Sequence, residues 1–260
     1  MSDLIGRTEE KALMQDFSEQ VSSRLSQLAE TADAGGFDAA VQLFADAVRA
    51  GGVIQAFGTG HSEAFAMEIA GRAGGLIPSS RITLRALVLR GGYQPEILTG
   101  SALERNPEVI GDLLSLYPID PRDVFVIASN SGVNGSIVEL ALAVKARGHK
   151  LIAVTSLAHT NAVEPKHSSG KRLSEVADVV IDNLAPFGDT TLTTADGTGV
   201  GAVSSLTAAY IAQLLTIGTA AKLAESGERP PFYISANVPG GDEHNNALED
   251  LYAERIRQVS

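Results

Sequence analysis

The sequence predicts an α/β fold, a doubly wound parallel sheet of five strands that is Rossmann-like or flavodoxin-like, flanked by helices and preceded by a helical extension. Short apolar runs alternate with helical stretches beyond residue 50. This alternation is typical of a parallel sheet with helices on both faces. The chain has 260 residues, of which 44% are hydrophobic and 20% charged. Such a chain suits one large globular domain or two small ones.

Two helices are predicted in the first 50 residues. Residues 34–36 (A-G-G) form a turn, and residues 38–50 predict a second helix that ends at Gly51 and Gly52. Residues 1–50 are therefore assigned to an N-terminal helical extension. In the first helix, apolar side chains recur every three or four residues, at Leu13, Phe17, Val21, Leu25 and Leu28.

Five short apolar segments predict the strands of the sheet. The first strand, residues 53–57, is followed by a glycine-rich loop and by a helical stretch at residues 63–73. The same order of strand, polar loop and helix recurs within residues 123–147, as expected of a parallel sheet. The remaining predicted strands are residues 83–89, 150–155 and 177–181.

Three further segments complete the chain. Residues 106–116 are predicted to be helical, whereas residues 157–173 form a long polar loop, and long loops are often functional. Residues 232–246 form another irregular polar segment. The predicted main domain therefore spans residues 51–225, and residues 226–260 form a C-terminal tail that contributes to the functional site or to a dimer interface.

The composition excludes several classes of function. Lys and Arg total 20 against 31 Asp and Glu, which gives a net charge of -11. Because an acidic protein without a basic stripe repels phosphate backbones, no nucleic-acid partner is expected. The chain contains no cysteine, so disulfides and cysteine nucleophiles are excluded. The first residues lack the basic and apolar regions of a signal peptide, so a cytoplasmic location is expected.

An uncharged stretch at residues 199–221 raises the question of membrane insertion. A spanning helix needs about 20 predominantly apolar residues, but hydroxyl and amide side chains interrupt this stretch. A helix buried in the core or in a subunit interface is therefore predicted, with no membrane partner. The apolar character of residues 204–223 also predicts an oligomer, either a homodimer or a tetramer. The interrupting residues are Ser204, Ser205, Thr207, Gln213, Thr216 and Thr219.

The residues G-T-G-H-S at positions 58–62 lie between the first strand and the helix that follows it. Glycines let the backbone approach an anion, and the free amides and dipole at a helix start favour negative charge. Ser62 adds a hydroxyl donor. A dinucleotide-binding loop would have glycine three residues after Gly60, where this chain has Glu63. Because an acidic side chain is unfavourable beside a pyrophosphate, a dinucleotide site is not predicted.

The residues S-N-S-G-V-N at positions 129–134 also follow a predicted strand and precede a helix. Their hydroxyl and amide groups are uncharged donors, which suits a phosphomonoester in an acidic protein. Ordinary helix caps and turns use the same residue types, so the alternative that these residues have only a structural role stays open. Because both loops follow strands of one sheet, they are expected to meet in a crevice. The predicted phosphate-binding residues are Gly60, Ser62, Ser129, Asn130, Ser131 and Asn134.

The pair of loops resembles that of the sugar isomerase (SIS) domain, a phosphosugar-binding family with a doubly wound fold. In that family a motif S-x-S-G-x-[ST] grips the sugar phosphate. Here Ser129, Ser131 and Gly132 match the motif, and Asn134 replaces its last hydroxyl residue. The first loop is similar to the family's G-x-G-x-S. The resemblance covers residues 41–224 and implies a small phosphosugar ligand and no cofactor.

Other segments resemble a subgroup of this family near N-acetylmuramic acid 6-phosphate etherase and amino-sugar phosphate enzymes. Several family isomerases and the etherase carry a glutamate ten residues after the serine of the first loop, where this chain has Arg72. Glu68, one turn earlier on the same helix face, is the candidate replacement. The segments that carry the resemblance are R-A-G-G at residues 72–75, H-S-S-G-K at 167–171, S-A-N at 235–237 and G-G-D-E-H-N at 240–245.

The chemistry expected of such a site starts at C2 of the open-chain sugar. The C2 hydrogen is acidic next to the C1 aldehyde, and a carboxylate or imidazole can remove it. Reprotonation of the enediolate at C1 gives a ketose, whereas loss of the C3 substituent gives an unsaturated product. Because an acetamido group on C2 disfavours the ketose, the predicted function is a lyase that dehydrates N-acetylglucosamine 6-phosphate. The alternatives are an aldose–ketose isomerase and a non-catalytic phosphosugar sensor.

Four side chains are candidates for the proton transfers, namely Glu68, His61, Glu104 and His244. Each has a structural alternative: Glu68 can pair with Arg72, Glu104 can lie on an exposed helix, and the histidines can bond to loop backbone. The resemblance links Glu104 to a catalytic glutamate of the etherase. It also links His244 to a histidine that related isomerases borrow from a neighbouring subunit.

Two further residues, His167 and Glu243, are predicted to contact the substrate. No metal is expected, because the 5 histidines are scattered without an H-x-x-x-H spacing. A sensor that binds DNA is disfavoured, because the first 50 residues predict only two helices and are acidic.

Overall fold

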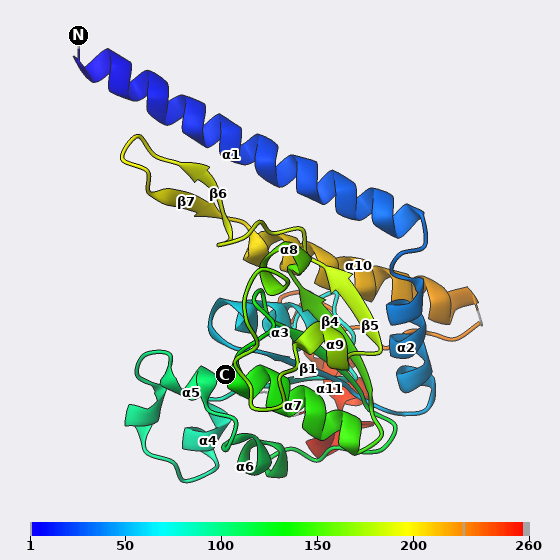
Figure 1. The fold of residues 1–260 in the computed structure, drawn as a ribbon. Coiled ribbons are helices and arrows are strands. Elements are labelled where there is room, and N and C mark those ends of the chain that lie inside the picture. Colours follow the sequence, from blue (N-terminus) through cyan, green and yellow to red (C-terminus); the bar gives the residue numbers. More distant parts are fainter. Residues whose placement is uncertain (1, 226, 257–260) are drawn as a thin grey trace.

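The computed structural model describes residues 2–225 and 227–256. Its centre is a five-stranded parallel sheet with the strand order β2-β1-β3-β4-β5 (Figure 1). All neighbouring strands of this sheet run parallel. The predicted α/β fold with a doubly wound parallel sheet is therefore confirmed. The strands are β1 (Ile54–Gly58), β2 (Ser79–Ile82), β3 (Val124–Ala128), β4 (Lys150–Thr155) and β5 (Val179–Asp182).

Helices contribute to a hydrophobic core on each face of the sheet. On one face these are α1 (Ser2–Asp33), α2 (Asp38–Arg49), α3 (Glu63–Ile69) and α10 (Ser204–Glu225). On the other they are α4 (Ala86–Leu89), α5 (Ala102–Arg105), α6 (Ile110–Ser115), α7 (Gly135–Ala146) and α9 (Leu173–Val176). The shorter elements are α8 (Leu157–Thr160), α11 (Gly241–Glu249) and the 3-10 turns η1 (Gly60–Ser62), η2 (Pro95–Leu98) and η3 (Ala253–Arg255).

The central strands β1 and β3 are buried along their whole length. β3 is an uninterrupted apolar run, and β1 is interrupted only by the buried Gln55 before its terminal glycine, because each strand contacts a core on both faces. Successive side chains of β3 alternate between these cores. Val124 and Val126 join the core on the side of α2, α3 and α10, and Phe125 and Ile127 join the core on the side of α6 and α7.

The N-terminal extension consists of the two predicted helices, α1 and α2. An antiparallel hairpin that the sequence did not predict lies beside α1 (Figure 1) and consists of β6 (Thr190–Thr193) and β7 (Gly199–Ala202). The contact is close, because a Cβ atom on Gly201 would lie 2.8 Å from the ring of Phe17. The uncharged stretch at residues 199–221 therefore divides into β7 and most of α10.

The prediction of a strand at residues 83–89 is wrong. The second strand of the sheet is β2, which ends at Ile82, and residues 86–89 form α4 instead. Ser79 and Ser80 of β2 are buried although they are polar. This strand therefore lacks the apolar run that marks β1 and β3, and the apolar run that follows it belongs to a helix.

Two other predicted segments differ in detail. The helix expected at residues 106–116 begins only at Ile110, beyond Pro107, which cannot donate a backbone hydrogen bond. The tail segment at residues 232–246 is not irregular throughout, because α11 begins at Gly241. In both places a helix is present, but it begins a few residues away from the boundary that the sequence predicted.

Helix α10 is long and apolar enough to cross a membrane by length and composition, the one such helix in the described part of the chain. It packs on α2 and α3. Thr207, Ile211 and Leu215 are buried in these contacts, and core helices of this kind meet the same length criterion. Leu206 and Ile217 on its other side are exposed, and the predicted oligomer stays a prediction.

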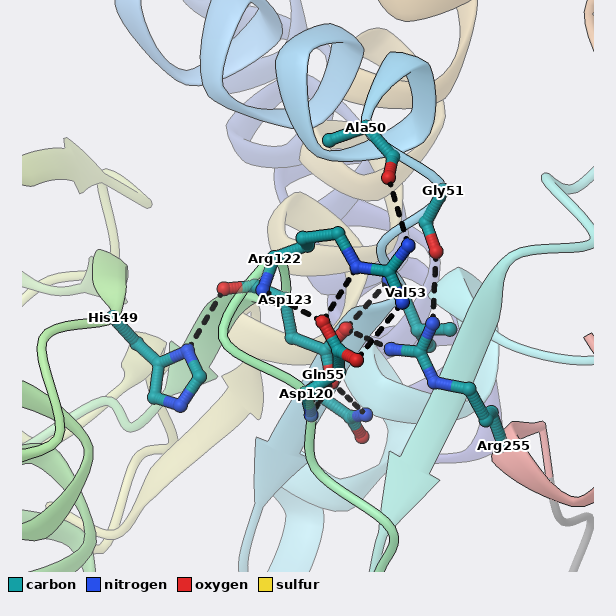
Figure 2. Close-up of polar contacts among 9 residues, drawn as sticks. All are labelled: Ala50, Gly51, Val53, Gln55, Asp120, Arg122, Asp123, His149 and Arg255. Atoms are coloured by element: carbon teal, nitrogen blue, oxygen red, sulfur yellow. Dashed lines mark hydrogen bonds and ion pairs between the residues drawn. The ribbon is translucent and has the colours of Figure 1, made fainter.

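A buried carboxylate joins the C-terminal segment to the amino end of the sheet (Figure 2). Asp123 accepts hydrogen bonds from the Val53 backbone amide at 2.8 Å and from Gln55 Nε2 at 3.0 Å. It also forms an ion pair with Arg255. Arg255 donates a second bond, from Nη1 to the Gly51 carbonyl at 2.8 Å. The segment around η3 is therefore held at the edge of the sheet opposite the loops that follow β1 and β3.

We expect the protein to lose stability in acid through Asp120, which lies beside this network. Hydrogen bonds from the Arg122 guanidinium and backbone amide lower the pKa of Asp120 well below its ordinary value. Because the folded pKa is depressed, the stabilisation is present above the ordinary value and is lost as the pH falls. The free energy of unfolding should therefore decrease between about pH 4 and pH 2. In Asp120→Asn, urea denaturation across this range should show a smaller decrease, and an unchanged slope would contradict the assignment.

Candidate functional site

Residues 58–62, called loop one below, turn sharply between β1 and α3. A Cβ atom on Gly58 would lie 2.2 Å from the Ser62 carbonyl oxygen, so only glycine allows the chain to fold back this closely. Thr59 is extended, and η1 leads directly into α3. Loop one therefore lies at the carboxyl end of β1, as the sequence predicted.

Residues 129–134, called loop two below, connect β3 to α7. Gly58 and Ala128, the last residues of β1 and β3, are register partners, so the two loops leave the sheet side by side. Ser129 Oγ accepts a hydrogen bond from the Gly132 amide at 3.1 Å. Asn134 precedes α7 without a side-chain capping bond. The first amides of α7 therefore have no side-chain cap from this residue, and helix starts of this kind attract anions.

Loop two depends on glycine at position 132, and we expect Gly132→Ala to destabilise the protein by about 1–3 kcal/mol. Gly132 has φ +64, and an added Cβ atom would lie 2.9 Å from Thr160 Oγ1 and 3.1 Å from Thr155 Oγ1. Urea denaturation measures the change. Gly111→Ala is the matched control, because an added Cβ atom there meets nothing within 4 Å. A loss at position 132 no larger than at position 111 would contradict this account.

The two loops line one small hollow. His61 and Ser62 come from loop one, and Ser129 and Asn130 come from loop two. Asn130 Oδ1 accepts a hydrogen bond from Asn183 Nδ2 at 3.1 Å. The volume of the hollow is about 10 Å³, which is room for about one water molecule. A phosphate group is larger, so it can enter the hollow only if the loops separate.

A larger cavity of about 380 Å³ lies against loop one and is lined by Thr59 and Gly60. Two carboxylates and a cation face it, from Glu63, Glu104 and Arg85. Most of the remaining wall is apolar, from Leu84, Val88, Leu89, Leu98 and Leu103. Concave sites with a few polar groups in an apolar wall are typical of small-molecule binding.

Glu104 lies between the two loops. Its Oε2 accepts a hydrogen bond from Thr59 Oγ1 at 3.1 Å, and its Oε1 would lie 3.1 Å from a Cβ atom on Gly60. Its backbone carbonyl accepts a bond from Ser136 Oγ, in the first turn of α7, at 2.6 Å. The side chain therefore touches loop one while the backbone touches the helix that follows loop two. The carboxylate therefore lies at the wall of the cavity next to loop one, where its free acceptor positions are open to a ligand.

The structure places Glu68 in an ion pair. Its carboxylate binds Arg72, four residues later and beyond the end of α3 at Ile69, and accepts a bond from Gln213 Nε2 of α10 at 2.9 Å. Among the described residues, the side chains that line the cavity and the hollow do not include Glu68. The role of Glu68 as a base therefore stays a prediction, and the contacts of its side chain do not support it.

The other predicted residues lie apart from the cavity. His167 is buried, and its Nε2 lies 2.9 Å from Glu139 Oε2 on α7. His244 Nε2 binds the Phe232 carbonyl at 2.9 Å, within the C-terminal segment that packs at the amino end of the sheet, and Glu243 beside it is exposed. Within one chain, His61, Ser62, Ser129 and Asn130 are therefore brought together at the hollow, and Glu104 lies in the neighbouring cavity against loop one. His167, Glu243 and His244 line neither space.

Sequence reasoning missed several residues that line these spaces. Glu63 was used to argue against a dinucleotide site and not as a site residue, and Arg85 was placed in a strand that does not exist. Two serines at the start of α10 also line the hollow, beside Asn183. Their position at a helix start was a usable signal, but nothing local in the sequence places α10 beside loop one. In the described residues, no group of three or more His, Cys, Asp or Glu side chains could hold a metal ion.

Comparison with known proteins assigns the chain to a family. A sequence profile described as the SIS domain matches residues 16–156. A UPF0309 protein of Listeria monocytogenes is 41% identical over 234 residues, which cover 89% of this chain and 94% of the relative. The chain belongs to the SIS domain family and to the UPF0309 family. A UPF0309 protein of Geobacillus thermodenitrificans is 38% identical to this SIS domain protein, over 84% of this chain and 86% of the relative.

Two solved structures share the fold of this SIS domain protein. One is an Escherichia coli CFT073 protein solved in complex with a ligand, with a TM-score of 0.51 and 16% identity over 84% of this chain and 93% of that chain. The other is a phosphoheptose isomerase from Neisseria gonorrhoeae, with a TM-score of 0.51 and 20% identity over 83% of this chain and 98% of that chain. At these identities the similarity concerns the fold, and it confirms the predicted SIS architecture.

Proposed function

We propose that this SIS domain protein is a phosphosugar lyase that dehydrates N-acetylglucosamine 6-phosphate across C2 and C3. The observation that carries the proposal is the position of Glu104, whose carboxylate lines the cavity and bonds to loop one, and whose backbone carbonyl bonds to Ser136 in the first turn of α7. A base that removes the C2 proton must lie beside the sugar while the phosphate is held elsewhere. The position of Glu104 supports its assignment as this base.

The uncharged donors of the two loops support a phosphate ligand. The side chains in question, from Ser62, Ser129, Ser131 and Asn134, add no charge to an acidic protein. The start of α7 contributes backbone amides and the positive end of a helix dipole. The name of one structural neighbour supports the same ligand class, since that protein is a phosphoheptose isomerase.

The contrast between the hollow and the cavity supports a direction of binding. The polar groups that line the hollow are hydroxyls, amides and an imidazole, whereas the cavity presents two carboxylates and one guanidinium, that of Arg85. A phosphate dianion is repelled by carboxylates, while sugar hydroxyls donate hydrogen bonds to them. The phosphate therefore belongs on the side of loop two and the sugar carbons on the side of Glu104.

Elimination is preferred to isomerisation for three reasons. An acetamido group on C2 disfavours formation of a ketose, and the subgroup that the sequence resembles lies near an etherase that acts on an amino-sugar phosphate. Arg72 also occupies the position of the glutamate that several family isomerases carry, and here it is paired with Glu68. The second candidate is an aldose–ketose isomerase, which is favoured by the fold shared with a phosphoheptose isomerase.

The test is to incubate the purified protein with N-acetylglucosamine 6-phosphate and to follow an unsaturated product by absorbance and mass spectrometry. The unphosphorylated sugar is the control, and calorimetry measures binding separately. A product lighter than the substrate by one water supports the lyase. A ketose that carries solvent deuterium shows the isomerase instead, and tight binding without any product shows a sensor.

A further inference from the structure

We infer that Glu63 is a second catalytic residue, which donates the proton to the oxygen that leaves C3. The inference rests on the proposed elimination and assigns its second proton transfer. Glu63 is the first residue of α3 and lines the same cavity as Glu104. An elimination needs both a base and an acid, because hydroxide is a poor leaving group until it receives a proton.

The two carboxylates are held in the same manner. Glu63 Oε1 accepts a hydrogen bond from Thr83 Oγ1 at 2.7 Å, and Glu104 Oε2 accepts one from Thr59 Oγ1 at 3.1 Å. Both threonines are buried, with relative exposures of 1% for Thr83 and 8% for Thr59. Each hydroxyl therefore fixes one carboxylate oxygen and leaves acceptor positions on the side chain for a ligand.

Thr83, whose hydroxyl binds Glu63, is itself held in place. The Thr83 amide donates to Tyr117 Oη at 3.0 Å, and Tyr117 is buried beneath Arg90, whose guanidinium lies 4.6 Å from the ring centroid. Burial raises the pKa of Tyr117, so this side chain stays neutral in the physiological range. A proton-transfer group works best when its position is set by a rigid surrounding shell, and Glu63 has such a shell.

Glu63 also differs from the acidic side chains that have a structural role. Glu68 pairs with Arg72, and Glu139 pairs with His167. Within the described part of the chain, no ion pair within 4.0 Å involves Glu63 or Glu104. Both carboxylates therefore stay available to a ligand in the cavity, which they share with Arg85.

The proposed step balances without a cofactor. Glu104, as the carboxylate, removes the C2 proton, and the electron pair of the C2–H bond becomes the C2–C3 double bond through the enolate. The C3–O bond breaks, and the departing oxygen takes the proton of the Glu63 carboxylic acid, so that water leaves. The step needs no oxidant or reductant. Solvent then removes the proton from Glu104 and returns one to Glu63.

The experiment separates the two proton transfers in D₂O. Wild-type protein, Glu63→Gln, Glu104→Gln and the exposed control Glu108→Gln are incubated with N-acetylglucosamine 6-phosphate. Deuterium at C2 of recovered substrate measures the first transfer, and unsaturated product measures the second. We expect Glu104→Gln to lose both signals. Glu63→Gln should keep C2 exchange within about twofold of wild type and lose product formation by about 10²-fold or more.

The outcomes distinguish this inference from the proposed function. Glu63→Asp retains a carboxyl group and should therefore form more product than Glu63→Gln. This result would support the role of Glu63 as the acid. Glu63→Gln with wild-type product formation overturns the inference and leaves the lyase intact. Loss of both exchange and product in a folded Glu63→Gln protein also overturns it, because the residue then acts at or before the first transfer. Wild-type protein with neither signal overturns the proposed function itself.

Discussion

Replacing Glu104 by glutamine is expected to lower kcat for the proposed dehydration by about 10²–10⁴-fold. The substitution keeps the size of the side chain and its hydrogen bond to Thr59, but it removes the group that accepts the C2 proton. Because the phosphate is held by the loops, the affinity for the phosphosugar should change by less than about fivefold. An interaction made only in the transition state lowers kcat and kcat/KM by the same factor.

Initial rates of product formation at several substrate concentrations measure this effect. Glu108→Gln is the matched control, since Glu108 is an exposed glutamate four residues later. Circular dichroism and calorimetric binding of the phosphosugar establish that the Glu104 variant is folded and loaded. A variant that retains a tenth of the wild-type kcat would contradict a role for Glu104 as the base.

Asp123→Ala is expected to lower the free energy of unfolding by about 3–5 kcal/mol, because it removes one partner of a buried ion pair. The side chain of Asp123 is 0% exposed. Its carboxylate accepts hydrogen bonds from four donors. These are the backbone amides of Val53 and Asp120, the side chain of Gln55 and the guanidinium of Arg255. The alanine variant leaves all four donors without this acceptor (Figure 2).

Urea denaturation followed by circular dichroism measures this loss. Asp250→Ala serves as the control, because Asp250 is exposed and surface changes usually lie within about 0.5 kcal/mol. Arg255→Ala should also be strongly destabilising, since it leaves the Asp123 carboxylate buried without its cation. A loss below about 1 kcal/mol for Asp123→Ala would show that the network contributes little to the folded state.

Local sequence patterns predicted the buried strands and the turns, because burial and tight turns each restrict which residue types can occur. Strands β1 and β3 are apolar runs because they are buried on both faces, and the loops that follow them contain the glycines and serines that tight turns demand. Strand β2 was missed for the opposite reason, because Ser79 and Ser80 are buried polar residues. The hairpin of β6 and β7 was missed because its contact with α1 is long-range and leaves no local period.

The candidate site was predictable only where it is built from consecutive residues. Loops one and two were recognised from their position after strands, and they do meet at one edge of the sheet. That Glu63 and Glu104 line the same cavity was not predictable, because 41 positions separate them in the sequence and they lie on different helices, α3 and α5. His244 was predicted as a site residue from the resemblance to related enzymes. In the structure it lies in the C-terminal segment, where it binds the Phe232 carbonyl.

The bond between Asp123 and Arg255 has a consequence for the order of folding during synthesis. Domains begin to fold while the ribosome is still extending the chain, and Asp123 is made 132 residues before Arg255. A sheet that forms in this interval carries the carboxylate without its cation. A chain truncated before Arg255 would therefore keep this charge without its ion-pair partner.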